Sequence, residues 1–314
     1  MNLTSNLTRP RGNTVLVMGA RGRFGKAAVH AFAAAGWHVI AQARSAQDEL
    51  HLPQVVTLQC DALDTARILA AVPEVDVIVN AVNPDYARWD SLLPPATAAV
   101  ITLAKATGAL LMVPGNVYNF GAGLPAVLHE DAPFVANTPK AAQRIAMEQS
   151  MADAAAEGVR SVVIRAGDFI GGTGTWLDMA ITKSVNKGVV THMGPNDLAH
   201  AWAYLPDLAK VFVRVAEQRS QLAAFEVMHY PGITATGQQV HAALEELSGR
   251  TLKAKAMPWL MMQGIALFSP LLKAVMQMRY LWQRPHQLTG RKLENLIGKL
   301  PASSLHEALR AYVK

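Results

Sequence analysis

The chain has 314 residues, of which 51% are hydrophobic and 17% charged, so it is long enough for one large domain or a domain with a smaller cap, and too apolar to be disordered. Its one cysteine, Cys60, excludes an internal disulfide, and the first residues lack the apolar core of a secretion signal, so we expect a cytoplasmic protein. Residues 257–314 account for the net charge of +6. No nucleic-acid recognition motif accompanies this charge, which leaves a solvated basic face, an anionic ligand or a membrane surface.

The N-terminal part of the sequence predicts a βαβ unit. A short apolar run at 14–18 leads into a glycine-rich turn, and an alanine-rich helix then extends from residue 26 to a stop at Gly36. A second strand follows at 37–44 and ends on an arginine. A strand, a glycine-rich loop and a helix in this order are typical of dinucleotide-binding sites.

The glycines of the turn have separate predicted roles. Gly19 allows the tight turn, Gly22 lets the backbone approach a pyrophosphate, and Gly25 lets the helix pack closely on the strand. The helix N-terminus would face the phosphates with its partial positive charge. The alternative is a glycine-rich turn without a ligand. It gives no reason for Gly22 and Gly25, which lower the stability of the helix. The cofactor-binding residues predicted in this loop are Gly19, Arg21, Gly22, Arg23, Phe24 and Gly25.

Arginines near the end of the second strand favour NADP over NAD. NAD sites usually place Asp or Glu at this point to bind the ribose 2′-hydroxyl, whereas this chain has Arg44 followed by Ser45. Arg21 lies in the glycine loop itself. Two guanidinium groups suit a 2′-phosphate, which arginine can bind in bidentate fashion. The alternative is that Arg21 and Arg23 are solvated loop residues.

Strands and helices alternate as far as about residue 165. Further strands are expected at 55–59, 75–80, 109–113 and 160–165, with helices at 64–71, 90–107 and 138–157. This alternation predicts an α/β fold with a Rossmann-type, doubly wound parallel sheet whose carboxyl edge binds ligands. Beyond a glycine-rich loop at 168–174, helices are expected at 176–186, 203–217 and 237–248, and strands at 189–193 and 225–230. Asp168 is interpreted as a turn-capping residue, with a pocket acid as the alternative.

The change of pattern near residue 167 predicts a small substrate-capping domain. We expect a dinucleotide-binding domain at 12–166 with a returning part at about 198–231, and a cap formed by 167–197 and 232–314. Residues 257–278 are mostly apolar, but prolines, a glycine and a lysine interrupt them before the roughly 20 apolar residues that a transmembrane helix needs. We therefore expect two short helices that roof an apolar pocket, and weak contact with a membrane surface stays open because a basic stretch follows.

Short motifs follow several of the predicted strands. They are the loop at 19–25, Cys60-Asp61-Ala62, Asn80-Ala81-Val82, Val117-Tyr118 and the run at 165–171. Together they resemble the extended and atypical short-chain dehydrogenase/reductase superfamily, with its NAD-dependent epimerase/dehydratase-like members. The resemblance implies that Asp61 and Ala62 meet the adenine and that Asn80 and Ala81 line the cofactor. The alternative for Asp61 is a cap of the helix that starts near Asp64, and both roles are compatible.

The catalytic residues depart from this superfamily. The position of the usual Ser or Thr falls on Pro114, and in the usual Tyr-x-x-x-Lys pair Tyr is replaced by Lys140 and Lys by Arg144. The helix motif Lys140, Arg144 and Glu148, together with Pro114, resembles the NADPH-dependent isoflavone and pinoresinol reductase type. That second resemblance implies that Lys140 is the acid–base residue and also lies at the cofactor.

The helix pattern is compatible with that chemistry. Residues i, i+4 and i+8 share one helix face, so Arg144 should lower the pKa of Lys140 if both point inward, and Glu148 would hold Arg144. The alternative is a solvent-facing stripe of charged side chains. Tyr118 is the other candidate proton donor, with a pocket-wall aromatic as its alternative. The predicted catalytic residues are Lys140, Tyr118 and Arg144.

These observations predict an NADP-dependent oxidoreductase of the atypical short-chain type that acts on a small organic substrate. The alternative is an NADP-binding sensor without turnover, because intact cofactor loops without the usual catalytic pair fit either protein. The ten histidines lack the spacing of metal ligands, so no metal site is expected. We expect a small-molecule substrate, no nucleic acid and no transmembrane span, and a homodimer is left open.

Overall fold

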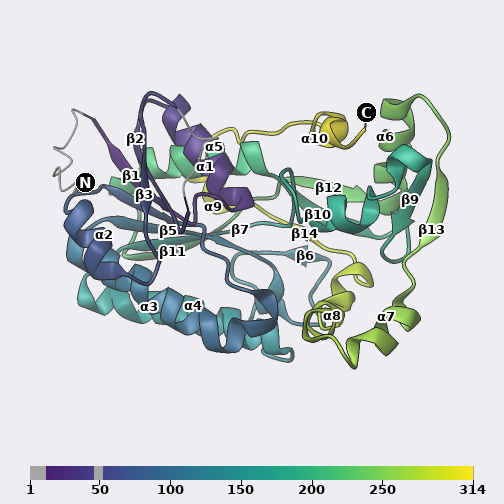
Figure 1. The fold of residues 1–314 in the computed structure, drawn as a ribbon, viewed down its shortest axis with the longest axis horizontal. Helices are drawn as coiled ribbons and strands as arrows, with labels where there is room; N and C mark the ends of the chain where they lie inside the picture. Colours follow the sequence, from purple (N-terminus) through teal and green to yellow (C-terminus); the bar gives the residue numbers. More distant parts are fainter. Residues whose placement is uncertain (1–11, 46–51, 314) are drawn as a thin grey trace. The chain divides into compact units, whose positions relative to one another are not determined.

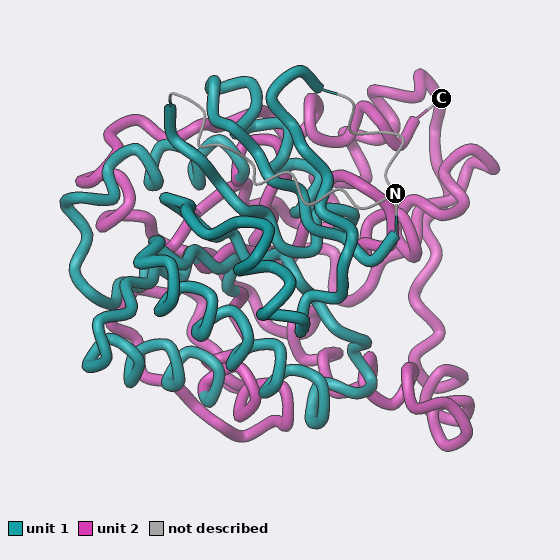
Figure 2. The backbone as a smooth tube through the Cα atoms, turned by 60° about the vertical axis from the view of Figure 1, so that its left-hand side comes forward, with its two compact units in different colours: residues 1–115, 146–164, 209–228 teal, residues 116–145, 165–208, 229–314 magenta. Residues whose placement is uncertain are grey.

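The computed structural model describes residues 12–45 and 52–313, which form two compact units (Figures 1 and 2). Unit 1 consists of residues up to 115 together with 146–164 and 209–228, and unit 2 consists of 116–145, 165–208 and 229 onward. Residues 116–145, which the sequence interpretation groups with the dinucleotide-binding domain, thus lie in unit 2.

The regular elements follow the alternation that the sequence predicts. The strands are β1 (Thr14–Met18), β2 (His38–Ala43), β3 (Val55–Gln59), β4 (Val77–Asn80), β5 (Leu110–Gly115), β6 (Val127–Leu128), β7 (Ser161–Arg165), β8 (Asp168–Ile170), β9 (Val189–His192), β10 (Ala199–Tyr204), β11 (Phe225–His229), β12 (Ile233–Thr236), β13 (Lys253–Ala256) and β14 (Gln287–Leu288). The α-helices are α1 (Arg23–Ala34), α2 (Thr65–Ala71), α3 (Trp89–Thr107), α4 (Pro139–Ala154), α5 (Leu205–Glu217), α6 (Gly237–Ser248), α7 (Trp259–Ala266), α8 (Pro270–Met276), α9 (Arg291–Ile297) and α10 (Leu305–Leu309).

Unit 1 is built on a seven-stranded sheet in the order β11-β7-β5-β4-β1-β2-β3, as a Rossmann-type fold requires. The strands from β3 to β5 pair in parallel, and β1 and β4 are buried along their whole length. In Figure 1, α1 covers one face of this sheet and α2 and α3 cover the other. The chain leaves β1 and β4 in opposite directions along the sheet, and in sheets of this type the ligand-binding crevice lies at the carboxyl ends of two such strands.

Helix α1 forms where the sequence predicts a helix, and its apolar face packs on the sheet. It begins at Arg23 after the extended Gly22 and ends before Gly36, whose φ of +80° a larger residue would rarely adopt. Phe24, in its first turn, packs edge-on against Phe212 of α5 with the ring centroids 4.6 Å apart. This contact anchors the first turn of α1 on α5, and the glycine loop directly precedes that turn.

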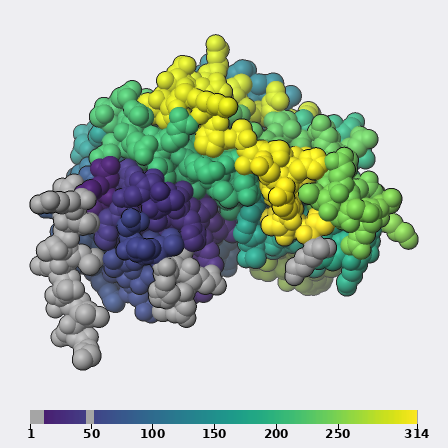
Figure 3. Space-filling view, turned by 90° about the horizontal axis from the view of Figure 1, so that it is seen from above, coloured from purple at the N-terminus to yellow at the C-terminus, as the bar shows by residue number. Residues whose placement is uncertain are grey.

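Unit 2 contains three small sheets, with the orders β12-β10-β8, β13-β9 and β14-β6. Helix α6 begins as the sequence predicts, because Thr236 and Gln239 form a reciprocal capping box, and it ends at Gly249 in the left-handed region. The C-terminal segment runs along the surface in Figure 3. Hydrogen bonds hold it to the rest of the unit, from Gly171 N to the Tyr312 hydroxyl at 2.8 Å and from Ser303 N to Asp207 Oδ2 at 2.7 Å.

Several segments of unit 2 differ from their predicted structure, including β8, which forms within the loop expected at 168–174, and two of them have a clear physical reason. The helix expected at 176–186 is reduced to a π-helical turn at Leu177–Ile181 and a 3₁₀ turn at Val185–Lys187, because Thr182 N bonds to Leu177 O and Gly188 ends the run. The strand β10 was not predicted, because its three alanines and His200 have weak intrinsic strand preference. Its pairing with β8 and β12 provides the stabilisation that the local sequence lacks.

Candidate functional site

The glycine loop of unit 1 has the close backbone contacts predicted for it. A Cβ at Gly25 would lie 2.3 Å from Gly19 O, so no side chain fits there. Gly19 has a φ of +71°, and a Cβ on it would lie 3.0 Å from the carbonyl group of Ala81. The carbonyl of Gly22 accepts the first helical hydrogen bond, from Lys26 N at 2.9 Å. The loop therefore presents backbone and the positive end of the α1 dipole at the crevice, a form suited to a pyrophosphate.

Gln42 holds this loop in place, although the sequence analysis did not select it. The side chain is 1% exposed at the end of β2. Its Oε1 accepts a hydrogen bond from Gly19 N at 2.9 Å, and its Nε2 donates to Cys60 O at 2.7 Å. One amide therefore connects the turn after β1 with the loop after β3. The available signal was a polar residue in an otherwise apolar, buried strand.

The two arginines selected from the sequence lie at the same edge of unit 1. Arg44 directly follows β2, and the guanidinium of Arg21 donates a hydrogen bond from Nη1 to Ser45 Oγ. Both side chains are exposed. A phosphate at this edge would therefore meet two cations and a hydroxyl, with little desolvation cost to the free protein. Arg23, at the start of α1, is half-buried rather than a fully solvated loop residue.

The loop after β3 places Asp61 and Ala62 beside this edge. The Asp61 side chain is exposed, and its Oδ1 accepts a hydrogen bond from Leu63 N at 2.9 Å. The cap of α2 is Asp64, which accepts from Arg67 N at 3.1 Å. The alternative role of Asp61 as the helix cap is therefore wrong. Asp61 instead stabilises its own tight turn and remains exposed.

Asn80 and Ala81 lie directly against the glycine loop. Asn80 pairs with Met18 in the sheet and is 6% exposed, and its Oδ1 accepts a hydrogen bond from Val82 N at 3.1 Å. Ala81 N bonds to Met18 O at 2.9 Å. The loops that follow β1 and β4 are therefore in contact. Unit 1 brings together the predicted cofactor-binding residues of the glycine loop, Arg44, Asp61 and Asn80 at one sheet edge.

Lys140 lies in unit 2, in the first turn of α4, and only 4% of its surface is exposed. Glu148, two turns further along the same helix, is also 4% exposed, and Arg144 between them is half-buried. The alternative of a solvent-facing stripe of charged side chains is therefore wrong. Burying a charged side chain costs free energy unless hydrogen bonds or opposite charges compensate for the lost water. The surroundings of Lys140 and Glu148 must therefore provide such partners.

Tyr118 and a second tyrosine lie near the start of α4. Tyr118 begins the 3₁₀ turn Tyr118–Phe120 and is half-buried, with its backbone N bonded to Asn116 Oδ1 at 3.0 Å. Burial raises the pKa of the Tyr280 phenol well above its usual value, and the nearby Tyr118 raises it further, while Thr138 acts in the opposite direction. Tyr280 was not selected from the sequence, where it follows the apolar segment without any recognisable motif.

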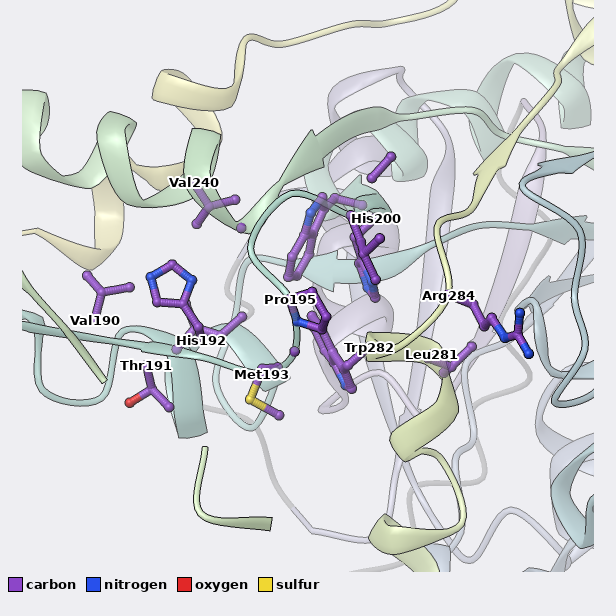
Figure 4. A pocket seen from close by; sticks show the side chains of 16 residues that line it. Val190, Thr191, His192, Met193, Pro195, His200, Val240, Leu281, Trp282 and Arg284 are labelled. Carbon is purple, nitrogen blue, oxygen red and sulfur yellow. The ribbon is translucent and has the colours of Figure 1, made fainter. Parts of the chain in front are cut away.

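Asp168, which is half-buried, and His200, which is buried, form a pair in unit 2. The His200 Nε2 lies 2.9 Å from Asp168 Oδ2, and the two residues come from the adjacent strands β10 and β8. The His200 ring stacks on Trp282, with centroids 4.1 Å apart and planes inclined by 5°. Both rings line the cavity in Figure 4, to which Arg284 also contributes. The interpretation of Asp168 as a turn cap is wrong, since its carboxylate is engaged with an imidazole.

Two further histidines of unit 2 are buried as neutral groups. Burial, with His200 next in importance, lowers the pKa of His286 to about 3. Burial and the neighbouring Arg165 guanidinium lower the pKa of His229 to about 4. Arg165 is fully buried, with its Nη1 3.3 Å from His229 Nε2 and its guanidinium carbon 4.6 Å from the centre of the Phe134 ring. Arg165 thus has aromatic and imidazole neighbours.

Within residues 12–45 and 52–313, no group of three or more His, Cys, Asp and Glu side chains could hold a metal ion. None of the helices that the structure describes is both long enough and apolar enough to cross a membrane.

The sheet order and the glycine loop define a dinucleotide-binding α/β protein, and a family model assigns it further. The chain belongs to the NAD dependent epimerase/dehydratase family, whose model matches residues 15–229. This assignment confirms the superfamily resemblance seen in the sequence motifs. A search of curated protein sequences found no match.

Solved structures of this class have the same fold over nearly the whole chain. The UDP-glucuronic acid 4-epimerase of Bacillus cereus in complex with NAD is 16% identical, with a TM-score of 0.76 over 95% of this chain and 97% of the epimerase. The enzyme WbmH of Bordetella bronchiseptica in complex with NAD⁺ is 15% identical, with a TM-score of 0.73 over 96% and 97%. The dTDP-glucose 4,6-dehydratase of Bacillus anthracis in complex with NAD is 14% identical, with a TM-score of 0.73 over 96% and 95%.

Proposed function

We propose that this protein is an NADP-dependent oxidoreductase of the atypical short-chain type, acting on a small organic substrate. The observation that supports this most directly is the burial of Lys140 at the start of α4, at the helix position where the superfamily has its catalytic tyrosine. The single cysteine, Cys60, which is buried and free, supports a cytoplasmic location.

The residues of unit 1 are themselves suited to a dinucleotide. Gly25 and Gly19 leave room for backbone only, so the α1 N-terminus can approach a pyrophosphate. Arg21, Arg44 and Ser45 offer donors that suit a 2′-phosphate, whereas an NAD site would have a carboxylate there. The related structures contain NAD, so the arginines are the reason to propose NADP for this chain.

The bound nicotinamide would supply the hydride, and this chain would supply the proton. Lys140, which is buried at the start of α4, would pass this proton from Nζ to the substrate oxygen or carbon that accompanies the hydride acceptor. Tyr118 and Tyr280 provide phenol groups near the start of the same helix. Burial raises the pKa of Tyr280, so this residue offers a protonated hydroxyl group rather than a phenolate.

Cofactor titration tests the first part of this proposal. We expect wild-type protein to bind NADPH more tightly than NADH by fluorescence titration. Arg44→Ala should weaken NADPH by about 1.5–3 kcal/mol, the value of a charge-assisted hydrogen bond, and leave NADH almost unchanged. Arg310→Ala, an exposed arginine of unit 2, serves as the control for loss of one positive charge. Equal affinity of the wild type for both cofactors would refute the NADP assignment.

Turnover measurements test the second part of the proposal, the acid–base role of Lys140. With a panel of carbonyl and enone substrates and NADPH, we expect Lys140→Met to lower the rate about 100-fold or more, the usual contribution of an acid–base group, while NADPH still binds. Full turnover by Lys140→Met would remove Lys140 from the chemistry. Tight NADPH binding by the wild type without turnover on any member of the panel would favour a sensor instead.

A further inference from the structure

Helices α7 and α8 form a hairpin of unit 2 that exposes large apolar side chains. The two helices pack on each other and follow β13 (Figure 1). Six of the hairpin's apolar side chains have between 47% and 89% of their surface exposed: Leu260, Met261, Ile265, Leu267, Phe268 and Leu271. The other exposed large apolar residues of the described chain are scattered over separate segments. A contiguous group of this kind normally marks an interaction surface.

The base of the hairpin is fixed, so the exposed residues are held in a defined position. The indole Nε1 of Trp259 donates a hydrogen bond to Met193 O at 2.6 Å, and the Arg279 guanidinium lies 5.6 Å from the centre of the Trp259 ring. Met278 and Leu281, directly after α8, are almost fully buried. The expectation that residues 257–278 roof a pocket is not met at the cavity of Figure 4, which is lined by Leu281 and Trp282 just beyond this segment and by no residue within it.

The surrounding sequence is cationic and contains no acid. Between Glu246 and Glu294 there is no Asp or Glu, while eight Lys and Arg residues occur. Lys253 and Lys255 are exposed on β13, two residues apart and therefore on one face of the strand that leads into α7. Lys273 is exposed on α8 itself. An exposed apolar group within a cationic, acid-free stretch of chain complements a surface that is apolar inside and negatively charged outside.

We propose that the α7–α8 hairpin docks this protein on an anionic lipid membrane, with its six exposed apolar side chains in the headgroup region and the neighbouring lysines on acidic headgroups. A second copy of the chain is a poorer partner, because a symmetric contact would place each cationic border against its own copy. The proposal goes beyond the oxidoreductase function and does not depend on it.

The length of the helices limits the depth of this contact. Helix α7 has 8 residues and α8 has 7, so each is only about 10–12 Å long against a hydrocarbon core of about 30 Å. The hairpin can therefore enter the interface but cannot span the bilayer. Binding should combine apolar insertion with a screened electrostatic attraction, and it should weaken as salt is raised.

Vesicle flotation of the full-length chain tests the proposal. We expect the wild type to float with vesicles of phosphatidylcholine and phosphatidylglycerol, to remain in solution with phosphatidylcholine alone, and to be released by salt. The double variant Leu267→Glu/Phe268→Glu should reduce partitioning onto the anionic vesicles by about tenfold or more. Lys253→Gln/Lys255→Gln should reduce it as well, by a smaller factor that disappears at high salt.

A matched variant separates docking from a general effect of added charge. Leu63→Glu/Met179→Glu introduces the same two acids at other exposed apolar positions and should float like the wild type. All variants should keep the wild-type circular dichroism melting curve, because the altered side chains are exposed. Equal binding to neutral vesicles, no flotation of the wild type, or equal loss in the matched variant would each overturn the proposal. So would self-association of the wild type that Leu267→Glu/Phe268→Glu abolishes without any vesicle binding.

Discussion

Replacing Gln42 by leucine removes a side chain that connects the glycine loop to the loop after β3. Leucine has nearly the same volume, so the main change is the loss of two hydrogen bonds, from Gly19 N at 2.9 Å and to Cys60 O at 2.7 Å. Both backbone groups then lack a partner at a side chain that is 1% exposed. An unsatisfied buried polar group costs about 1–3 kcal/mol, and the Gly19 end is only partly buried, so we expect Gln42→Leu to lower the free energy of unfolding by about 2–4 kcal/mol.

The same change should weaken cofactor binding. The Gly19 turn would lose its connection to β2, and its free N–H would compete for water or ligand, so the loop would have to be ordered when the dinucleotide binds. We expect NADPH affinity to fall about tenfold or more in fluorescence titration, with an unchanged denaturant m-value and a lower midpoint in urea unfolding.

Gln59→Leu is the matched control. Gln59 is at the end of the adjacent strand β3, and its Nε2 donates to Arg44 O at 3.4 Å in an exposed position. Because water can replace that weak bond, Gln59→Leu should stay within about 0.5 kcal/mol of the wild type. Wild-type stability and NADPH affinity in Gln42→Leu would refute the role of Gln42. So would an equal loss of unfolding free energy in both glutamine variants.

Two further predictions concern the close contact at Gly25 and the burial of His286 and His229. Gly25→Ala should abolish measurable NADPH binding, because its Cβ would lie 2.3 Å from Gly19 O, whereas Gly123→Ala, with open space around it, should bind normally in the same titration. His286 and His229 have pKa values of about 3 and about 4 in the fold against 6.5 unfolded, so their contribution to stability is complete above pH 6.5 and is lost as the pH falls. Urea unfolding should therefore show stability falling between pH 6.5 and 4 by up to about 1.4 kcal/mol per pH unit for each histidine, and His286→Gln should reduce that slope; a pH-independent midpoint would contradict this.

The parts of the fold that were predictable depend on local chemistry. The loop after β1 was found because glycine conformation and helix initiation are both properties of a few consecutive residues, and Gly25 has the steric reason assigned to it. The helix α6 was predicted from Thr236 and Gly249, its two ends, for the same reason. Signals of this kind need no knowledge of the tertiary structure.

The parts that were missed depend on partners distant in sequence. Gln42 and Cys60 are 18 residues apart, and His200 and Asp168 are 32 apart, so neither pair forms a recognisable motif. Tyr280 is important only because the fold places it near Tyr118. The exposure of α7 and α8 could not be predicted either, since an apolar run is equally compatible with a buried roof and with a surface made for another partner.

The burial of charged side chains on α4 bears on the choice between an enzyme and a sensor. Binding a dinucleotide requires the loops of unit 1, and neither Lys140 nor Glu148 belongs to those loops. Both are 4% exposed, and Lys140 occupies the helix position of the superfamily's catalytic tyrosine. A buried amine at that position has a chemical use in an enzyme and none in a protein that only binds the cofactor. We therefore expect turnover by the wild type and its loss in Lys140→Met, whereas a wild type that binds NADPH and never turns over would favour the sensor.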